Sequence, residues 1–352
     1  MRTLSRIAQS RRPAGPSSSG GRRLRLGFVP LFDSAPLIMA RELGLFEANG
    51  LQVQLHREIG WATVREKLLY RELDAVHALA PMLFAASRGL GSVPIDCLTG
   101  LVLRVGGNAI TLSAPLLRSG VRDGRGLREW SAGRNEPLVF GIPFLYSCHH
   151  FLLHAWLESS GFVPHRDVRL VVVPPPQMPG NLKAGHLDGF CAGEPWNSVA
   201  TLARAGGRVA GSAQIAPGHP EKVLMVRREF AEARADEHAG LIRSLLEACR
   251  FCVAPENRGR LVETLARPGY LNVPEPALAA CFEESGTAAP FDARVHEPTS
   301  AGAEWVLANL VKVGLLPPRS AAAAGPADLF RADLFQNATR TPFPHEPITS
   351  LP

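Results

Sequence analysis

Two neighbouring stretches decide the fold: residues 170–178, Leu-Val-Val-Val-Pro-Pro-Pro-Gln-Met, and residues 187–197, Leu-Asp-Gly-Phe-Cys-Ala-Gly-Glu-Pro-Trp-Asn. The first is an apolar run that stops at three prolines, which is typical of a buried strand. The second predicts a strand over Gly189 to Ala192, then a turn and a helix that begins at Glu194-Pro195, because proline is tolerated at the first helical position. Such a strand-to-helix junction leaves backbone N–H groups free at a crevice, where they can bind an anion.

Outward from this point, short apolar runs alternate with helical patterns along most of the chain. Strands are expected over 24–29, 51–55, 75–78, 95–98, 109–112, 138–141, 168–173 and 222–226, with helices between them. Asp33-Ser34-Ala35-Pro36 predicts the start of the helix after the first strand, with a capping side chain and a proline in the first turn. From residue 237 onward the pattern is almost entirely helical. Repeated strand–helix units predict parallel, doubly wound α/β sheets.

The order of these units predicts a two-lobed clamshell. Residues 24–115 and 216–316 form lobe I in this interpretation, and residues 116–215 form lobe II, with a surface loop over 118–136. Residues 1–23 are predicted to be a disordered basic tail, and residues 317–352 a tail that wraps around the body. Ligands of such sheets bind beyond the carboxyl ends of the strands, so the two sites would face each other across one cleft.

The charge distribution excludes several classes of protein. The formal net charge is +6, but seven arginines fall within the first 25 residues, and the remainder carries −1. The basic pI therefore belongs to the tail, and no direct nucleic-acid partner is expected. The sequence contains no run of about 18 apolar residues, so no membrane span is predicted. No continuous apolar segment follows the basic start, so we expect a cytoplasmic protein, with a periplasmic location as the alternative.

Catalytic and metal-binding motifs are also missing from the sequence. There is no Gly-x-Ser-x-Gly elbow, phosphate loop or dinucleotide fingerprint, so neither an enzyme nor a cofactor is expected. Cys249 and Cys252 have redox or zinc spacing, but they lie within a helical pattern without a second pair. The six cysteines are expected to be free thiols.

Several segments, taken together in order and spacing, carry a family resemblance. They include Gly27-Phe-Val-Pro-Leu31, Ala40-Arg-Glu-Leu-Gly-Leu-Phe46, Gly60-Trp-Ala62, Gly193-Glu-Pro-Trp-Asn197 and His219-Pro-Glu-Lys-Val-Leu224. With them the chain resembles the nitrate- and bicarbonate-binding proteins related to substrate-binding subunits of bacterial ABC transporters. The resemblance implies the type II periplasmic-binding-protein fold from about residue 24 to residue 335.

Within that family, the missing export signal favours one branch. The branch is a soluble nitrate/nitrite sensor (NasS type), which holds an ANTAR-type antiterminator response regulator inactive until the anion binds. The alternative is the substrate-binding subunit of a nitrate importer, with an ABC permease and ATPase as partners. Both readings are non-catalytic.

The resemblance implies a pocket for nitrate or nitrite made by Trp61, Asn108, His149, Gly193, Glu194 and Lys222. Lys222 would supply the positive charge and His149 a donor at a helix start. Trp61 would offer an indole N–H or a flat wall. Asn108 stands where transporter members often have glutamine. A lysine at 222 in place of a carboxylate favours nitrate or nitrite over bicarbonate, but the sequence does not separate nitrate from nitrite.

Some roles stay open at this stage. Lys222 could be a solvated lysine at a strand end, and Trp61 a core residue. Either His149 or its neighbour His150 could face the ligand. Glu194 could orient Lys222, accept from His149, or simply cap its helix. His77 and Trp196 are expected to pack against the floor of the cleft.

Overall fold

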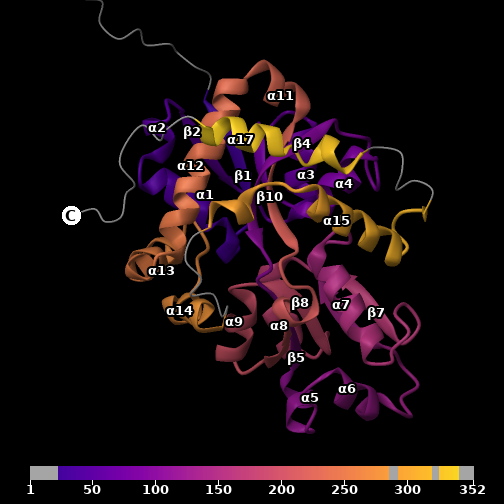
Figure 1. The fold of residues 1–352 in the computed structure, drawn as a ribbon. Helices are drawn as coiled ribbons and strands as arrows, with labels where there is room; N and C mark the ends of the chain where they lie inside the picture. Colours follow the sequence, from indigo (N-terminus) through magenta and orange to yellow (C-terminus); the bar gives the residue numbers. More distant parts are fainter. Residues whose placement is uncertain (1–22, 285–291, 319–324, 341–352) are drawn as a thin grey trace, which may run out of the picture.

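The computed structural model describes residues 23–284, 292–318 and 325–340. Within them the chain forms two α/β lobes, each built on a five-stranded sheet (Figure 1). The first segment of the predicted basic tail, 1–22, and the C-terminal residues 341–352 lie outside the described residues.

The first lobe contains one sheet and the larger hydrophobic core. Its strand order is β2 (Val53–Arg57), β1 (Leu24–Phe28), β3 (Ala75–Leu79), β10 (Pro220–Arg227) and β4 (Cys97–Val105). β1 runs parallel to β2 and β3, whereas β10 runs antiparallel to both of its neighbours. Every residue of β3 is buried, as expected for a strand covered on both faces.

The second lobe repeats the design with a smaller core. Its sheet order is β7 (Val168–Val172), β6 (Leu138–Ile142), β8 (Gly189–Gly193), β5 (Asn108–Ser113) and β9 (Gly206–Gly211). β6 runs parallel to β7 and β8, and β5 runs antiparallel to β8 and β9. The prediction of two α/β lobes is thus confirmed. Each sheet is mixed, with antiparallel pairs beside the expected parallel ones, because one strand crosses into each lobe from the other.

Helices cover both sheets. Those of the first lobe are α1 (Ala35–Glu42), α2 (Leu45–Ala48), α3 (Trp61–Leu69), α4 (Ala80–Ser87), α11 (Arg228–Ala233), α12 (Ala235–Val253), α13 (Arg258–Ala266), α14 (Glu275–Glu284), α15 (Ser300–Lys312), α16 (Pro326–Leu329) and α17 (Ala332–Arg340). Those of the second lobe are α5 (Ala114–Arg118), α6 (Gly124–Ser131), α7 (Cys148–Ser159), α8 (Met178–Lys183), α9 (Trp196–Leu202) and α10 (Ser212–Ile215). Short 3₁₀ turns lie at Phe32–Ser34, Pro175–Gln177, Pro255–Asn257 and Ala293–His296.

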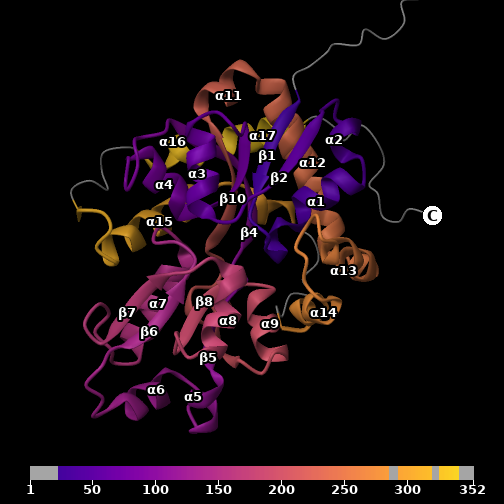
Figure 2. The same ribbon diagram turned by 180° about the vertical axis from the view of Figure 1, so that it is seen from behind.

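Figure 2 shows α3 and α4 in front of the first sheet, with α12 and α17 behind it. The second core lies between the sheet and α5, α6 and α7, and a third small cluster lies under α8 and α9. The segment predicted as a surface loop, 118–136, contains α6, whose start is capped by Asp123 accepting from the N–H of Gly126 at 2.7 Å. The loop prediction was therefore wrong over Gly124–Ser131.

Two chain segments connect the lobes side by side. One runs from β4 to β5 through Gly106 and Gly107, whose φ angles of +58° and +93° lie in the region that favours glycine. The other runs from α10 to β10. The N–H of Gly106 donates to the carbonyl of His219 at 3.0 Å, and the N–H of Gly107 donates to the hydroxyl of Ser212 at 2.9 Å. The two connections are therefore hydrogen-bonded to each other.

None of the helices in the described part of the chain combines the length and the apolar character that a bilayer crossing requires. The six cysteines are free thiols, as expected. Cys249 and Cys252 both lie within α12.

Candidate functional site

Both lobes contribute polar residues to one place, at the edges where the parallel strands of each sheet end. Asp33 follows β1, Trp61 begins α3 after β2, and Lys222 lies near the start of β10, opposite Leu79 at the end of β3. From the second lobe, Asn108 begins β5 opposite Gly193, the last residue of β8. The carboxyl edges of both sheets therefore meet at one place, as the sequence predicted from the strand–helix order.

Lys222 is the centre of this arrangement and is fully buried. Its Nζ lies 2.8 Å from Oδ2 of Asp33 and 2.7 Å from Oε1 of Glu221. Burial alone would lower the pKa of Lys222, but the two carboxylates outweigh burial and raise it above its ordinary value. Lys222 is therefore a charged ammonium inside the protein, and the alternative of a solvated strand-end lysine is excluded.

Glu221 holds the cluster together from the other side. Its Oε2 accepts from Nδ2 of Asn108 at 2.6 Å and lies 3.2 Å from Nε2 of His219. Burial would raise its pKa, but Lys222 and the surrounding donors keep it well below the ordinary value. We use the name Lys222 cluster for this set: Asp33, Trp61, His77, Asn108, His149, His219, Glu221 and Lys222.

His149, and not His150, faces the cluster. Nδ1 of His149 lies 3.7 Å from Oε1 of Glu221, and the ring is fully buried. The orientation follows from the start of α7, where Ser147 caps the helix by accepting from the N–H of His150. His150 points elsewhere, with Nδ1 3.0 Å from the carbonyl of Leu145. Burial lowers the pKa of both imidazoles to about 4, so both are neutral at pH 7.

Two aromatic rings lie on the first-lobe side of the cluster, and one of them contacts the ammonium. Nζ of Lys222 lies 5.6 Å from the centroid of the Trp61 ring, within the range of a cation–π contact. Trp61 in turn lies against His77, with ring centroids 5.4 Å apart. Nε2 of His77 lies 3.1 Å from Oδ1 of Asp33, so His77 contacts the cluster directly.

Three buried rings in the cluster carry a nitrogen that has no hydrogen-bond partner in the described protein. They are Trp61 at Nε1, His149 at both ring nitrogens, and His77 at Nδ1. An unsatisfied buried donor costs about 1–3 kcal/mol, so such groups are uncommon without a reason. Trp61 and His149 lie beside Lys222 or its partner Glu221, and a bound molecule with acceptor atoms would satisfy their N–H groups.

Glu194 neither orients Lys222 nor accepts a hydrogen bond from His149. Its Oε1 lies 3.2 Å from Nη1 of Arg208, and its Oε2 accepts from the N–H of Ser198 at 3.1 Å. The helix-capping alternative is thus confirmed, and the orienting role belongs to Glu221 and Asp33 instead. α9 itself begins one residue later than predicted, at Trp196, with Pro195 as the N-cap residue.

The remaining predicted residues lie at the contact between the lobes. A Cβ on Gly193 would stand 3.3 Å from Leu31 and 3.4 Å from Asn108, so the absence of a side chain lets the two lobes approach. Trp196 is buried and donates through Nε1 to the carbonyl of Pro30 at 3.2 Å. Trp196 is therefore an inter-lobe contact.

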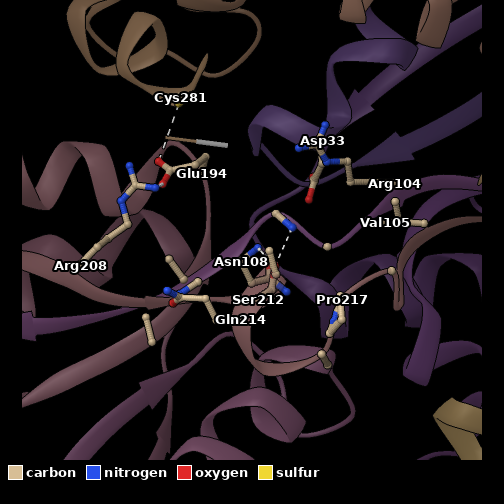
Figure 3. A pocket seen from close by; sticks show the side chains of 18 of the residues that line it. Asp33, Arg104, Val105, Asn108, Glu194, Arg208, Ser212, Gln214, Pro217 and Cys281 are labelled. Atoms are coloured by element: carbon tan, nitrogen blue, oxygen red, sulfur yellow. Dashed lines mark hydrogen bonds and ion pairs between the residues drawn. The ribbon is translucent and has the colours of Figure 1, made fainter. Parts of the chain in front are cut away.

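An open cavity of about 650 Å³ adjoins the cluster. Of the cluster, only Asp33 and Asn108 reach its wall; Arg104, Glu194 and Arg208 line other parts of it. Figure 3 shows Asp33 and Arg104 on one side and Arg208 and Gln214 across from them. The cavity is therefore a route from solvent that ends at Asp33, whose side chain is 10% exposed.

Among the described residues, one group could offer donors to a metal ion at this site. Cys148, His219 and Glu221 place donor atoms within 4.8 Å of one another. Burial, with the charge of Glu221 adding to it, raises the pKa of the Cys148 thiol well above its ordinary value, so it is not a thiolate. Lys222 already places a positive charge 2.7 Å from Glu221. These residues fit a cation poorly.

Three residues of the cluster were missed from the sequence as site residues. Asp33 was read as part of a capped helix start, but its carboxylate accepts from Lys222 and the helix α1 has no side-chain cap bond. Glu221 and His219 were part of a quoted motif but received no role. Burial opposes the charge on Asp33, and Lys222 and His77 outweigh it, which lowers the pKa of Asp33 below its usual range.

Comparison with known proteins places this geometry in context. The chain is 39% identical over 251 residues to the nitrate import ATP-binding protein NrtC of Synechocystis sp. PCC 6803, covering 70% of this chain and 38% of that protein. It is 36% identical over 310 residues to the bicarbonate transport ATP-binding protein CmpC of Synechococcus elongatus, covering 84% and 46%. The chain thus spans less than half the length of these two relatives.

One solved structure is similar over nearly the whole length. It is the periplasmic nitrate-binding protein NrtA from Synechocystis PCC 6803, with a TM-score of 0.82, 25% identity, and coverage of 90% of this chain and 88% of that one. The two-lobed α/β architecture is thus that of periplasmic binding proteins. The family model described as NMT1-like matches residues 18–266. The chain belongs to the NMT1-like family.

Proposed function

We propose that the chain is a non-catalytic binding protein for nitrate or nitrite, held at the Lys222 cluster between the lobes. The observation that carries this proposal is the pair of buried, unpartnered N–H donors of Trp61 and His149 beside a buried ammonium. Nitrate is planar and monovalent, and it offers acceptors without a proton to donate. It therefore matches a dry site that supplies donors and one positive charge.

The charges around Lys222 determine which group an entering anion has to displace. One ammonium already faces two carboxylates, Asp33 and Glu221. An anion reaching Lys222 has to compete with one of them. Asp33 is the one that also reaches the cavity wall, so it is the carboxylate that can turn out toward water when the anion enters. Asp33 thus acts as a resident anion at the ammonium.

Lys222 also matters for whether bicarbonate could bind at this site. Bicarbonate needs an acceptor for its hydroxyl and is helped by a bound cation. Here the ammonium of Lys222 supplies the positive charge next to Glu221, and the thiol of Cys148 is protonated. One relative transports bicarbonate by name, so this ligand belongs in the test.

We infer a role in uptake as the setting for this binding. The relatives named above are import and transport proteins, and the similar structure is a periplasmic nitrate-binding protein. These likenesses support a substrate-binding component that works with an ABC permease and ATPase, the alternative of the sequence analysis. They give no support that would distinguish a sensor with an antiterminator partner, and a periplasmic location fits them better than a cytoplasmic one.

Calorimetry tests the binding directly. We expect saturable, one-to-one binding of nitrate and nitrite, and none of sulfate, which is larger and divalent. Lys222→Met should abolish binding, while the matched change of the exposed Lys183 on α8, Lys183→Met, should leave it unchanged. Tight binding of bicarbonate with no binding of nitrate would contradict the proposal.

The role needs a separate test. Deleting the gene should abolish nitrate-dependent growth or uptake at low external nitrate if the protein serves an importer. Normal uptake with lost nitrate-dependent expression of assimilation genes would instead favour the sensor.

A further inference from the structure

His219 joins the Lys222 cluster from the connection between α10 and β10. Its side chain is fully buried. Both of its ring nitrogens have a partner: Nδ1 lies 2.7 Å from the carbonyl oxygen of Ala216, and Nε2 lies 3.2 Å from Oε2 of Glu221. The ring is therefore held in one orientation, between a backbone carbonyl and a carboxylate.

Both partners of His219 are acceptors of hydrogen bonds. A carbonyl oxygen can only accept. Burial would raise the pKa of Glu221, but Lys222 and the surrounding donors hold it well below its ordinary value, so this carboxyl group is ionised and also accepts only. A neutral imidazole has one N–H and one lone pair, and in either tautomer one of the two contacts would bring that lone pair against an acceptor. Hydrogen on both nitrogens satisfies both contacts.

The neighbouring thiol does not supply the missing hydrogen. Sγ of Cys148 lies near His219 and Glu221, but it donates to the carbonyl of Pro220 at 3.3 Å. The hydrogen bond between His219 and Glu221 therefore needs an N–H on Nε2, in addition to the one that Nδ1 donates to Ala216.

An aromatic face covers the ring of His219. Trp305 on α15 is stacked on it, with ring centroids 5.0 Å apart and an angle of 28° between the planes. The face of a tryptophan ring attracts a cation within about 6 Å of its centroid. Figure 1 shows α15 next to α7, where the two lobes meet. A buried charge needs such partners, and this ring has a carboxylate, a carbonyl and an aromatic face.

We propose that His219 is an imidazolium in the folded protein and acts as a positioning residue for the anion site, by neutralising Glu221. This inference rests on the proposed function. With His219 charged, Glu221 has a cation of its own at 3.2 Å. Lys222 is then balanced by Asp33 alone, although Glu221 still orients its ammonium from 2.7 Å. The entering anion has to displace only Asp33, and Glu221 can stay in place.

Nuclear magnetic resonance of the ring nitrogens tests the charge of His219 without any anion. In protein that carries ¹⁵N-labelled histidine, at pH 7, both nitrogens of His219 should resonate as protonated nitrogens. The signals can be assigned by through-space contacts with the ring of Trp305 and by their absence from His219→Gln. His150 is the internal reference, because burial lowers its pKa to about 4 and its neutral ring should show one unprotonated nitrogen. An unprotonated nitrogen on His219 would overturn the proposal, whether or not nitrate binds.

Calorimetry with nitrate tests the positioning role. His219→Gln keeps a possible donor for Glu221 but removes the positive charge, so nitrate should bind about tenfold more weakly or worse, the scale of one charge-assisted hydrogen bond. The matched control is His186→Gln, at an exposed histidine of the second lobe, which should leave the affinity unchanged. Circular dichroism should show that both variants remain folded.

A double variant separates this role from simple packing. If His219 acts by neutralising Glu221, removing the charge of Glu221 removes the need for it, so His219→Gln/Glu221→Gln should bind nitrate more tightly than His219→Gln alone. Two residues that serve only to pack the site would give no such recovery. A double variant that binds no better than His219→Gln would overturn the positioning role. No nitrate binding by the unaltered protein would overturn the proposed function and this role with it, whereas the ring resonances decide the charge of His219 independently.

Discussion

The Lys222 cluster and the three histidines His150, His154 and His165, named here the histidine cluster, are built in opposite ways. The Lys222 cluster joins both lobes and is held by charges, with an ammonium 2.8 Å and 2.7 Å from two carboxylates. The histidine cluster belongs to one lobe and contains only rings. Adjacent residues, His149 and His150, belong to different groups because consecutive helical positions point about 100° apart. The comparison teaches that one helix start can present one histidine to the contact between the lobes and the next to the interior of a single lobe.

The largest difference between the two clusters should appear in stability. Lys222→Met leaves the buried carboxylates of Glu221 and Asp33 without their cation. Removing one partner of a buried charge pair costs about 3–5 kcal/mol, so chemical denaturation should show a loss of that size. His154→Ala in the histidine cluster should change the free energy of unfolding by about 0.5 kcal/mol or less, as for other solvent-facing positions. Similar losses for both variants would contradict the contrast.

The next largest effect should be a gain. Asp33→Asn removes the carboxylate that competes with the anion for Lys222, so the affinity for nitrate should rise roughly tenfold or more, because a hydrogen bond to a charged group is worth about 1.5–3 kcal/mol. The same change should lower stability, since the ammonium loses a partner. Calorimetry with nitrate measures the first effect and denaturation the second. Weaker nitrate binding in Asp33→Asn would show that Asp33 does not occupy the place of the ligand.

The next effect is smaller and concerns the pH dependence of nitrate affinity, which His149 in the Lys222 cluster should produce. Without an anion, burial keeps the pKa of His149 at about 4. A bound anion nearby favours the imidazolium and raises that pKa, so binding takes up a proton and affinity rises as pH falls. The slope is at most about tenfold per pH unit below the pKa of the liganded state and above that of the free state. Nitrate is the right probe because it does not titrate, and His149→Gln should abolish the dependence. An affinity for nitrate that is flat between pH 8 and pH 5 would contradict this linkage and show that His149 takes up no proton when the anion binds.

The smallest effect should come from a single N–H. Trp61→Phe keeps an apolar ring but deletes the unpartnered Nε1–H, so nitrate binding should weaken by about 0.5–1.5 kcal/mol, a few-fold to about tenfold. Stability without nitrate should hardly change, since that N–H has no acceptor in the described protein. Trp130→Phe, on α6 in the second core, is the matched control and should leave nitrate affinity unchanged. Equal effects of the two variants on affinity would contradict the assignment.

The sequence predicted the order of strands and helices well where the local pattern was strong. β6, β7 and β8 were placed to within one residue at each end, because apolar runs bounded by proline or glycine are clear signals. β9 was missed, since Gly206-Gly-Arg-Val-Ala-Gly211 has too few apolar residues to alternate. Its pairing with β5 is what makes it a strand.

The chemistry of the site was harder to predict because its pairs are far apart in sequence. Asn108 and Glu221 are separated by 113 residues. A local reading placed Asp33 in a capped helix start, which is a usual place for an aspartate. It left Glu194 between Lys222, His149 and a helix cap, and it did not consider Arg208, because the pattern did not reveal the strand β9 that carries this partner. Lys222 and His149 were found because a resemblance, and not a local pattern, pointed to them.

The paired connections at Gly106–Gly107 and His219 have a mechanical consequence. Two connecting segments that are hydrogen-bonded to each other act as a hinge with one preferred axis. The lobes should therefore rotate apart about that axis and resist rotation about others. Lys222 lies close to that hinge, three residues from His219, whereas Glu194, which contacts Cys281 on α14 at 3.7 Å, lies across the cavity from it. A rotation of a few degrees therefore displaces the far rim more than the ammonium. Opening of the lobes would therefore widen the entrance to the cavity, while Lys222 would move little.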